Sequence, residues 1–353
     1  MHNIGKREFL TALGMGLLHF AFSLFVIFSS VWLCLAVWIQ EPFGWLISRL
    51  LIGIWIAFAL SILGIYVTQH FFSRIKDVLL YILIFIFSLF WYFGIQAKQD
   101  REWSPEVAKI LNYQRQGDIV TLNNIRNFTW HKDGSYDEHW ETRQIYLNQI
   151  NGVNIITSYW MGPQIAHTLV SFDIANAKPL TFSIEIRKEK DEEFSAIGGF
   201  FRKYEVSLVA SDEKDIVYTR SNIRNEQVYF FPINMPKTEM KALFEEYLLK
   251  SDQLNKQAKW YNTLTTNCTT LVFDMVQAIS KNELPVDYRI LASGYLPNYL
   301  YDLGAINHDW DMKTWYQRAH VNPKSSQYDQ FSQQSSIHYS NVIRVGLPQS
   351  QAQ

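Results

Sequence analysis

Three long stretches without a charged side chain constrain the first 97 residues of the chain. No Asp, Glu, Lys or Arg occurs in residues 9–40, 50–73 or 78–97. Each stretch is long enough for a helix to cross the ~30 Å hydrocarbon core of a bilayer. Helices of soluble proteins normally keep a polar face, which these stretches lack. The sequence therefore predicts a membrane domain, residues 1–97, with three transmembrane helices at 10–39, 50–72 and 78–97.

The charges that flank these segments predict their orientation. Lys6 and Arg7 precede the first segment, and Arg74 and Lys76 lie between the second and third, whereas the first loop has only Arg49. Positive flanks stay in the cytoplasm. We therefore expect an integral inner-membrane protein with a cytoplasmic N-terminus and a large periplasmic domain. The first segment is too long for a cleaved signal peptide.

The exported part has a mixed charge that excludes some classes of function. It holds 27 of the 32 Lys and Arg residues and 30 of the 33 Asp and Glu residues, with both signs interspersed. The sequence therefore does not indicate a nucleic-acid-binding surface, which would need a basic patch. No C-x-x-C or H-x-x-x-H spacing indicates a metal, so no metal or cofactor is expected. We expect an α+β domain at 98–320, followed by a polar extension at 321–353 that packs only loosely.

The clearest structural pattern in this domain is a β-hairpin. Residues 167–174 and 179–187 alternate apolar and polar side chains, as strands with one buried face do. Pairing the apolar faces gives partners whose numbers sum to about 352, which sets His167 beside Glu185. A slip of two residues would bring Ser183 or Arg187 there instead. Further strands are expected at 203–210 and 226–232, and helices at 236–257 and after residue 268.

Cys268 is the chain's most informative single residue. It is the only cysteine of the exported part, since Cys34 lies in the first span, so no disulfide can form within the domain. Thr265, Thr266 and Asn267 are helix-capping residue types and predict that Cys268 occupies a first helical turn. Helix N-termini lower cysteine pKa values, and their N–H groups can stabilise an oxyanion. A buried structural cysteine, a metal ligand and an intermolecular disulfide remain alternatives.

A nucleophilic cysteine needs a base and a group that orients the base. Among the six exported histidines, only His167 lies on a strongly predicted strand, on its polar face. Glu185 is the first candidate for the third group and Ser183 the second. Three arginines could bind a lipid phosphate or form structural ion pairs: Arg126, Arg187 and Arg224.

Several motifs resemble the Lnb N-terminal periplasmic domain family. They are "SYWMGPQIAHTLVSFDI", "FSIEIRKEKDEEFSAIGGFFRKYEV", "RSNIRNEQVYFFPI" and "WYNTLTTNCTTLVFDM". The family resembles circularly permuted papain-like (NlpC-like) thiol enzymes, in which a strand histidine precedes a cysteine at a helix N-terminus. The resemblance implies Cys268 as nucleophile, His167 as base and Glu185 or Ser183 as third residue, with Asn267 and Tyr261 lining the site.

The resemblance also implies an activity on lipids. Lnb members are associated with moving an acyl chain from the lipid glycerol to the N-terminal amine of bacterial lipoproteins. We therefore expect a cysteine-dependent acyltransferase or hydrolase whose partners are the bilayer and a lipid or lipoprotein substrate. Two alternatives stay open: a cell-wall peptide amidase with the same dyad, and a non-catalytic envelope scaffold.

Overall fold

The computed structural model describes residues 2–68, 73–280, 283–328 and 336–350. The chain forms two compact units. The first comprises residues 1–97 and the loop 195–203, and the second comprises residues 98–194 and 204–353.

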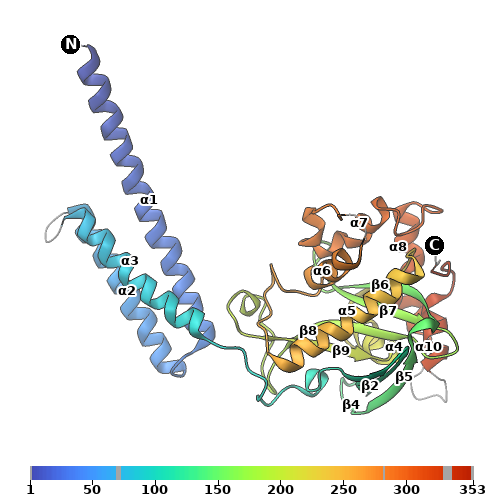
Figure 1. Cartoon of the computed structure of the whole chain (residues 1–353). Helices are drawn as coiled ribbons and strands as arrows, with labels where there is room; N and C mark the ends of the chain where they lie inside the picture. The colour runs from blue at the N-terminus through green and yellow to red at the C-terminus, as the bar shows by residue number, and fades with distance from the viewer. Residues whose placement is uncertain (1, 69–72, 281–282, 329–335, 351–353) are drawn as a thin grey trace. The chain divides into compact units, whose positions relative to one another are not determined.

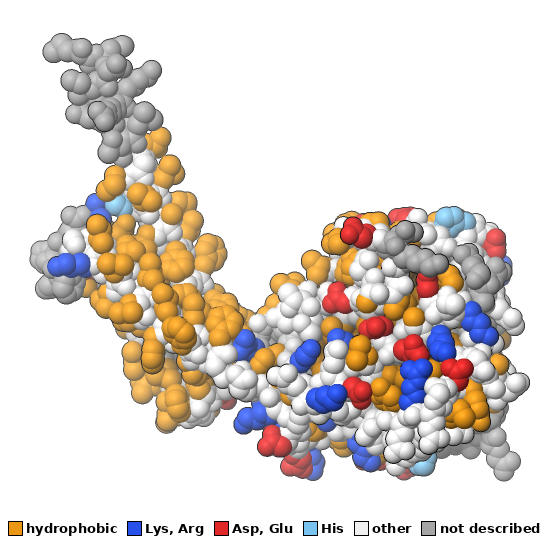
Figure 2. Space-filling view, in the orientation of Figure 1, with side chains coloured by type: hydrophobic (Ala, Val, Ile, Leu, Met, Phe, Trp, Pro, Cys, Tyr) orange, Lys and Arg blue, Asp and Glu red, His pale blue; other side chains and the backbone are white. Residues whose placement is uncertain are grey.

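Three long helices form most of the first unit (Figure 1): α1 (His2–Gln40), α2 (Trp45–Thr68) and α3 (Arg74–Gly94). The stretches Leu13–Gln40, Trp45–Thr68 and Arg74–Gly94 are long and apolar enough to cross a membrane. Hydrophobic side chains cover most of the visible surface of these helices (Figure 2). The prediction of three apolar helices is confirmed, although α2 and α3 begin earlier than expected. Residues 69–72 of the second predicted span lie outside the described residues.

The loop 195–203 is bound to the ends of α1 and α3. Phe201 packs with Ala36 and Tyr92. The side-chain amide of Gln40 donates to the Phe201 and Arg202 carbonyls at 2.6 and 2.9 Å. Arg202 donates in turn to the carbonyls of Tyr92, Phe93 and Ile95 at 3.0–3.2 Å. A helix C-terminus leaves carbonyls without intrahelical partners, so this arginine caps α3 from more than 100 residues away in sequence.

A mixed eight-stranded sheet organises the second unit. Its order is β1 (Asn112–Gln116), β2 (Ile119–Arg126), β9 (Glu205–Ser211), β8 (Leu180–Arg187), β7 (Ala166–Ile174), β6 (Ile150–Tyr159) and β10 (Gln227–Ile233), with β5 (Trp140–Tyr146) also paired to β2. Only β2 and β9 run parallel among the described pairs. A small ribbon joins β3 (Thr129–Trp130) to β4 (Tyr136–Asp137). The predicted α+β class is confirmed.

The alternating pattern of the predicted hairpin explains how the sheet is covered. Val170 pairs with Phe182 in the expected register. Both side chains pack beneath α5 (Lys237–Lys256), where the Phe182 ring stacks on Tyr247 at 4.5 Å. Leu169, one residue along, belongs to a second buried cluster on the other face. Because side chains alternate along a strand, neighbouring residues of β7 belong to two different hydrophobic clusters, one on each face of the sheet.

The remaining helical segments are short. They are α4 (Glu213–Tyr218), α6 (Thr270–Ile279), α7 (Leu296–Asp302), α8 (Met312–Ala319), α9 (Asn322–Ser325) and α10 (Ser336–Arg344). Single turns occur at η1 (Pro105–Val107), η2 (Leu147–Gln149), η3 (Gly198–Phe200), η5 (Tyr288–Ile290) and η6 (Ser293–Tyr295), and η4 (Thr219–Ile223) is a π-helical turn.

The C-terminal extension does not pack loosely, contrary to the prediction. In α10, Tyr339 and Ile343 are fully buried in the second cluster. Arg344 donates to both carboxylate oxygens of Glu213 and to Asp173, each at 2.7 Å. Tyr339 and Ile343 are four residues apart, so they share a helix face that the Ser/Gln-rich composition conceals.

Candidate active site

The hairpin register brings together the predicted base and both candidates for the third group. His167 is at the start of β7, and its Nε2 lies 2.7 Å from Ser183 Oγ and 3.2 Å from Glu185 Oε1. Ser183 donates to the same Glu185 oxygen at 2.6 Å. Both side chains come from β8. The pairing that aligns the apolar faces therefore also fixes the imidazole ring on the polar side.

Cys268 lies at the capped start of a helix. Regular α6 begins at Thr270, but the capping hydrogen bonds begin at Asn267, whose Oδ1 accepts from the Thr269 and Thr270 N–H groups at 2.8 and 2.9 Å. The Asn267 carbonyl accepts from Leu271 N–H at 3.1 Å. By this geometry Cys268 is the first residue after the cap. It is only 6% exposed.

The thiol of Cys268 lies close enough to the imidazole of His167 for each group to shift the pKa of the other. Burial raises the pKa of the thiol, but the neighbouring imidazolium outweighs burial and lowers that pKa below its usual value. For His167, burial and Arg220 lower the pKa, yet Glu185 and Cys268 raise it to about 9. Both shifts favour a thiolate paired with an imidazolium. Because Nε2 contacts Ser183 and Glu185, Nδ1 is the ring nitrogen left for the thiol.

A buried arginine extends this chain of charges. Arg220, in η4, donates to Glu185 Oε1 at 2.7 Å and to Glu226 Oε2 at 3.0 Å. Glu226 also accepts from Ser158, the cross-strand partner of His167. Arg220 is 5% exposed. Burial raises the pKa of Glu185, but the positive charges of His167 and Arg220 hold it well below the usual range. Negative and positive groups thus alternate from Cys268 to Glu226.

The two predicted lining residues have different roles. Burial raises the pKa of Tyr261, and so do the negative charges of Cys268 and Glu185. Its phenol is therefore protonated next to the thiolate. Asn267 caps the helix, and its Nδ2 donates to the Thr263 carbonyl at 2.7 Å. The Thr269 and Thr270 N–H groups are consequently occupied, which corrects the prediction that helix N–H groups are free for an oxyanion.

Comparison with known families places this site in a recognised domain. Residues 136–294 match the model of the Lnb N-terminal periplasmic domain. This segment is a Lnb N-terminal periplasmic domain. The match covers the histidine, serine, glutamate, arginine and cysteine just described, and the predicted family is confirmed. Searches of curated proteins and of solved structures returned no match. The chain is a membrane protein that carries a Lnb domain.

Sequence reasoning on single residues missed Arg220 and Glu226 of the Lnb domain. Both lie in the motif "RSNIRNEQVYFFPI", where they are the first and seventh residues. Arg220 reaches Glu185 across 35 positions of sequence, from a π-helical turn that no periodicity predicts. The signal that could have identified them is the presence of opposite charges, Arg220 and Glu226, inside a family motif that leads into an apolar strand.

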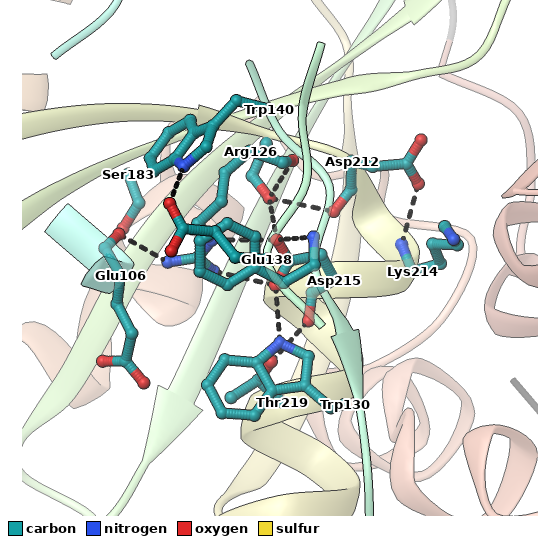
Figure 3. A network of polar contacts seen from close by, with 12 residues as sticks. Glu106, Arg126, Trp130, Glu138, Trp140, Ser183, Asp212, Lys214, Asp215 and Thr219 are labelled. Atoms are coloured by element: carbon teal, nitrogen blue, oxygen red, sulfur yellow. Dashed lines mark hydrogen bonds and ion pairs between the residues drawn. The ribbon is translucent and has the colours of Figure 1, made fainter. Parts of the chain in front are cut away.

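Two of the three arginines that were candidates for binding a lipid phosphate form structural contacts within the second unit. Arg126 donates to both oxygens of Asp215 at 2.8 and 3.0 Å, and the Trp130 indole N–H donates to the same carboxylate at 2.8 Å (Figure 3). Arg187 donates to the Val107 and Ala108 carbonyls, and its guanidinium lies 4.4 Å from the centre of the Trp103 ring.

The third arginine, Arg224, is more exposed and pairs with Glu106 at 3.1 Å. Within the described residues, no group of three His, Cys, Asp or Glu side chains could hold a metal ion.

Proposed function

We propose that this protein is a membrane-anchored cysteine acyltransferase that acts on a lipid ester. One observation carries the proposal: a cysteine at a capped helix start lies beside His167, which Glu185 and Ser183 orient from the next strand. A nucleophile, a base and an orienting group are the parts that covalent acyl transfer requires. Strand histidine before helix cysteine is also the order of permuted papain-like (NlpC-like) enzymes, and we assign the Lnb domain to that fold.

In the first step the Cys268 thiolate attacks the ester carbonyl carbon. A carbon–sulfur bond forms, and the carbonyl electrons move to oxygen. When the tetrahedral intermediate collapses, the carbon–oxygen bond of the ester breaks, and His167 gives its Nδ1 proton to the departing alkoxide. The products are an alcohol and a thioester on Cys268. Glu185 supports the imidazolium before this transfer, since it holds the positive charge at 3.2 Å.

In the second step an amine attacks the thioester carbonyl. Neutral His167 takes the proton that the amine loses, and the thiolate leaves as the amide forms. This restores the starting ion pair. The N-terminal amine of a lipoprotein is the acceptor we assign, so that an acyl chain passes from the glycerol ester to that amine. With water as acceptor, the same steps give hydrolysis.

Tyr261 is the candidate for holding the oxyanion. Its phenol has a raised pKa and so stays protonated, and the charge of Cys268 acts on it directly. The next two N–H groups are taken by Asn267. A donor aimed at the developing oxyanion is typically worth ~10²–10³ in rate.

Exposed apolar side chains support a lipid substrate. Ile165 is two residues before His167, and Leu264 is four before Cys268; they are 38% and 53% exposed. Met161, on the same loop as Ile165, is also exposed. Apolar groups gathered on the segments that carry a dyad are typical of a site for an apolar ligand. The three apolar helices keep the enzyme at a bilayer, where acyl donors are concentrated.

The topology of the proposal follows the charge flanks. The N-terminus is cytoplasmic, the protein is in the inner membrane, and residues 98–320 with the extension 321–353 are periplasmic. Attachment of a cysteine-specific, membrane-impermeant reagent at an engineered site in 98–135 of intact spheroplasts, but not at one in 1–8, tests this arrangement.

The decisive test is capture of the thioester. Purified full-length Cys34→Ser protein, whose single thiol is Cys268, is incubated with a p-nitrophenyl fatty ester and then analysed by mass spectrometry. We expect one hydroxylamine-sensitive acyl group on Cys268, which His167→Ala abolishes. A diacylglyceryl-cysteine lipopeptide with a free amine should then receive the acyl chain.

The two alternatives predict other outcomes. A cell-wall amidase would release amines from a stem peptide and would not form the lipid thioester. A scaffold would form no adduct with either probe, although the Cys268–His167 contact would be intact. Acylation that is indifferent to His167 would also contradict the proposed mechanism.

A further inference from the structure

A cavity of about 720 Å³ lies in the second unit, lined by residues that the proposed chemistry does not use. Cys268 and His167 are not among them. Volumes of this size are ordinary for small-molecule sites. The cavity is therefore a second candidate binding site, separate from the thiol, and its walls indicate which chemistry it takes.

The walls of the cavity combine aromatic rings with polar tips. They include Tyr159, Trp160, Tyr229, Tyr295 and Tyr316. The rings of Tyr159 and Tyr316 each meet Tyr229 edge to face, at 5.5 and 5.3 Å. This contact pattern makes the wall rigid before any ligand arrives. Trp160 differs from the others because the residue is 45% exposed; its ring meets Phe194 edge to face at 5.3 Å, and the rest of this broad flat ring is available to a ligand.

Polar groups of several kinds converge on the same space. Asn298 uses its Oδ1 to accept from Tyr316 at 3.0 Å, which leaves its amide N–H groups as donors. Arg224 and Glu226 add a strong donor and a strong acceptor, and Gln227 adds an amide. One charge of each sign and two amides give a wall that has no dominant charge but can both donate and accept.

The cavity is built on the strands that hold the catalytic histidine. Tyr159 pairs with Ala166, one step from the pairing of Ser158 with His167. Ser293 Oγ contacts the Ala166 N–H and carbonyl at 3.0 and 2.7 Å. At Gly294, which lines the cavity, a Cβ atom would stand 2.1 Å from the Pro163 carbonyl oxygen. This glycine therefore allows the close approach of two loops that closes the cavity wall.

We propose that this cavity binds a neutral oligosaccharide. A sugar ring presents apolar C–H faces that stack on an exposed indole, and hydroxyl groups that both donate and accept hydrogen bonds. Trp160 offers a surface on which a sugar face can stack. The hydrogen-bonding partners for the hydroxyl groups are Asn298, Gln227, Arg224 and Glu226. An acyl chain would use none of the remaining hydrogen-bonding capacity of these polar groups, whereas sugar hydroxyls would. A phosphate or a peptide carboxylate would face Glu226 as well as Arg224.

The position of Glu226 connects the cavity to the charges around the thiol. Its carboxylate lines the cavity and accepts from Arg220, which in turn holds Glu185. A saccharide here would therefore place a glycan-bearing molecule near the active site without contacting Cys268. The binding does not depend on the proposed acyl transfer, since none of the lining side chains takes part in it.

The test uses full-length protein in a polyoxyethylene detergent, because maltoside detergents carry sugars themselves. Calorimetry and saturation-transfer NMR measure binding of chitotetraose and maltotetraose, with a cell-wall stem peptide and oleate as comparisons. We expect at least one tetrasaccharide to bind, and Trp160→Ala to weaken it by about tenfold or more, as loss of an aromatic contact and its buried area does. Trp160→Phe should restore part of the affinity.

Matched variants keep the outcome interpretable. Tyr146→Ala removes an exposed aromatic side chain outside the cavity and should leave binding unchanged. Cys268→Ser should also bind normally, which separates this site from the enzyme's chemistry. Failure of both tetrasaccharides to bind, binding unaffected by Trp160→Ala, or binding of oleate or the stem peptide in their place would each overturn the proposal.

Discussion

Replacing Glu185 with glutamine tests whether this carboxylate creates the reactive thiolate. The substitution keeps the size and the hydrogen-bonding capacity of the side chain but removes the negative charge 3.2 Å from His167 Nε2. At an effective dielectric constant of about 20, two unit charges at that distance attract by about 5 kcal/mol. That is equivalent to an upper limit of about 4 pKa units.

The direction in which the pKa of His167 changes follows from the groups that remain around it in the Glu185→Gln variant. Burial and Arg220 both lower the pKa of His167, and Glu185 and Cys268 oppose them to bring it to about 9. Without the carboxylate, the larger of the two opposing charges is gone, so the pKa of His167 falls. A neutral imidazole no longer stabilises the thiolate, so the pKa of Cys268 rises towards or above its ordinary 9.0.

The assay is the rate of Cys268 alkylation by iodoacetamide between pH 5 and 10, in a Cys34→Ser background. We expect the wild-type rate to stay high below pH 9 and the Glu185→Gln rate at pH 7 to be lower by at least ~tenfold, since each pKa unit changes the thiolate fraction tenfold. Ser183→Ala, which removes hydrogen bonds but no charge, should shift the profile less. Superimposable wild-type and Glu185→Gln profiles, with both proteins folded by circular dichroism, would refute the reasoning.

Four further measurements test other parts of the structure. Arg220→Met should raise the pH at which acylation of Cys268 becomes half-maximal or falls off. Arg220→Lys should retain part of the wild-type pH profile. Identical pH profiles for wild type and Arg220→Met would contradict a positioning role for Arg220. Tyr261→Phe should slow acylation by ~10²-fold with an unchanged alkylation profile, and unchanged acylation would exclude it as oxyanion donor. Asn267→Ala should cost about 1 kcal/mol of stability in denaturant unfolding, as lost helix caps do. Arg344→Met should cost about 3 kcal/mol of stability at neutral pH, because it leaves the Glu213 charge buried without a partner. The pKa of Glu213 is lowered in the fold, so the wild type should lose its extra stability over the variant as the pH falls below about 4.5. A stability difference that does not depend on pH would contradict the ion pair.

The hairpin and its site geometry could be predicted because local pattern and chemistry agree there. A period of two fixes which side chains share a face, and the apolar faces allow only registers that differ by two residues. The observed pairing of Leu169 with Ser183 is the predicted one, and it brings Glu185 to His167. The helix start near Cys268 was predictable for a similar reason, since an asparagine cap acts within three residues.

The parts that sequence reasoning missed depend on long-range contacts. Arg220 finds its partners through a π-helical turn, which has no sequence period of its own. The C-terminal helix has a polar composition, so the burial of Tyr339 becomes apparent only when its face meets the sheet. The occupied N–H groups after Asn267 likewise depend on which side chain reaches them first.

The loop 195–203 has a practical consequence for work on the periplasmic part alone. The chain passes between the two units three times: after Ala97, after Phe194 and after Lys203. A truncated chain that starts at residue 98 would keep this loop but lose its helical partners, leaving Phe201 in water and Arg202 without the carbonyls it caps. Removal of the anchor therefore needs a second change, replacement of 195–203 by a short polar connection between Phe194 and Tyr204, before such a fragment can be expected to stay monomeric.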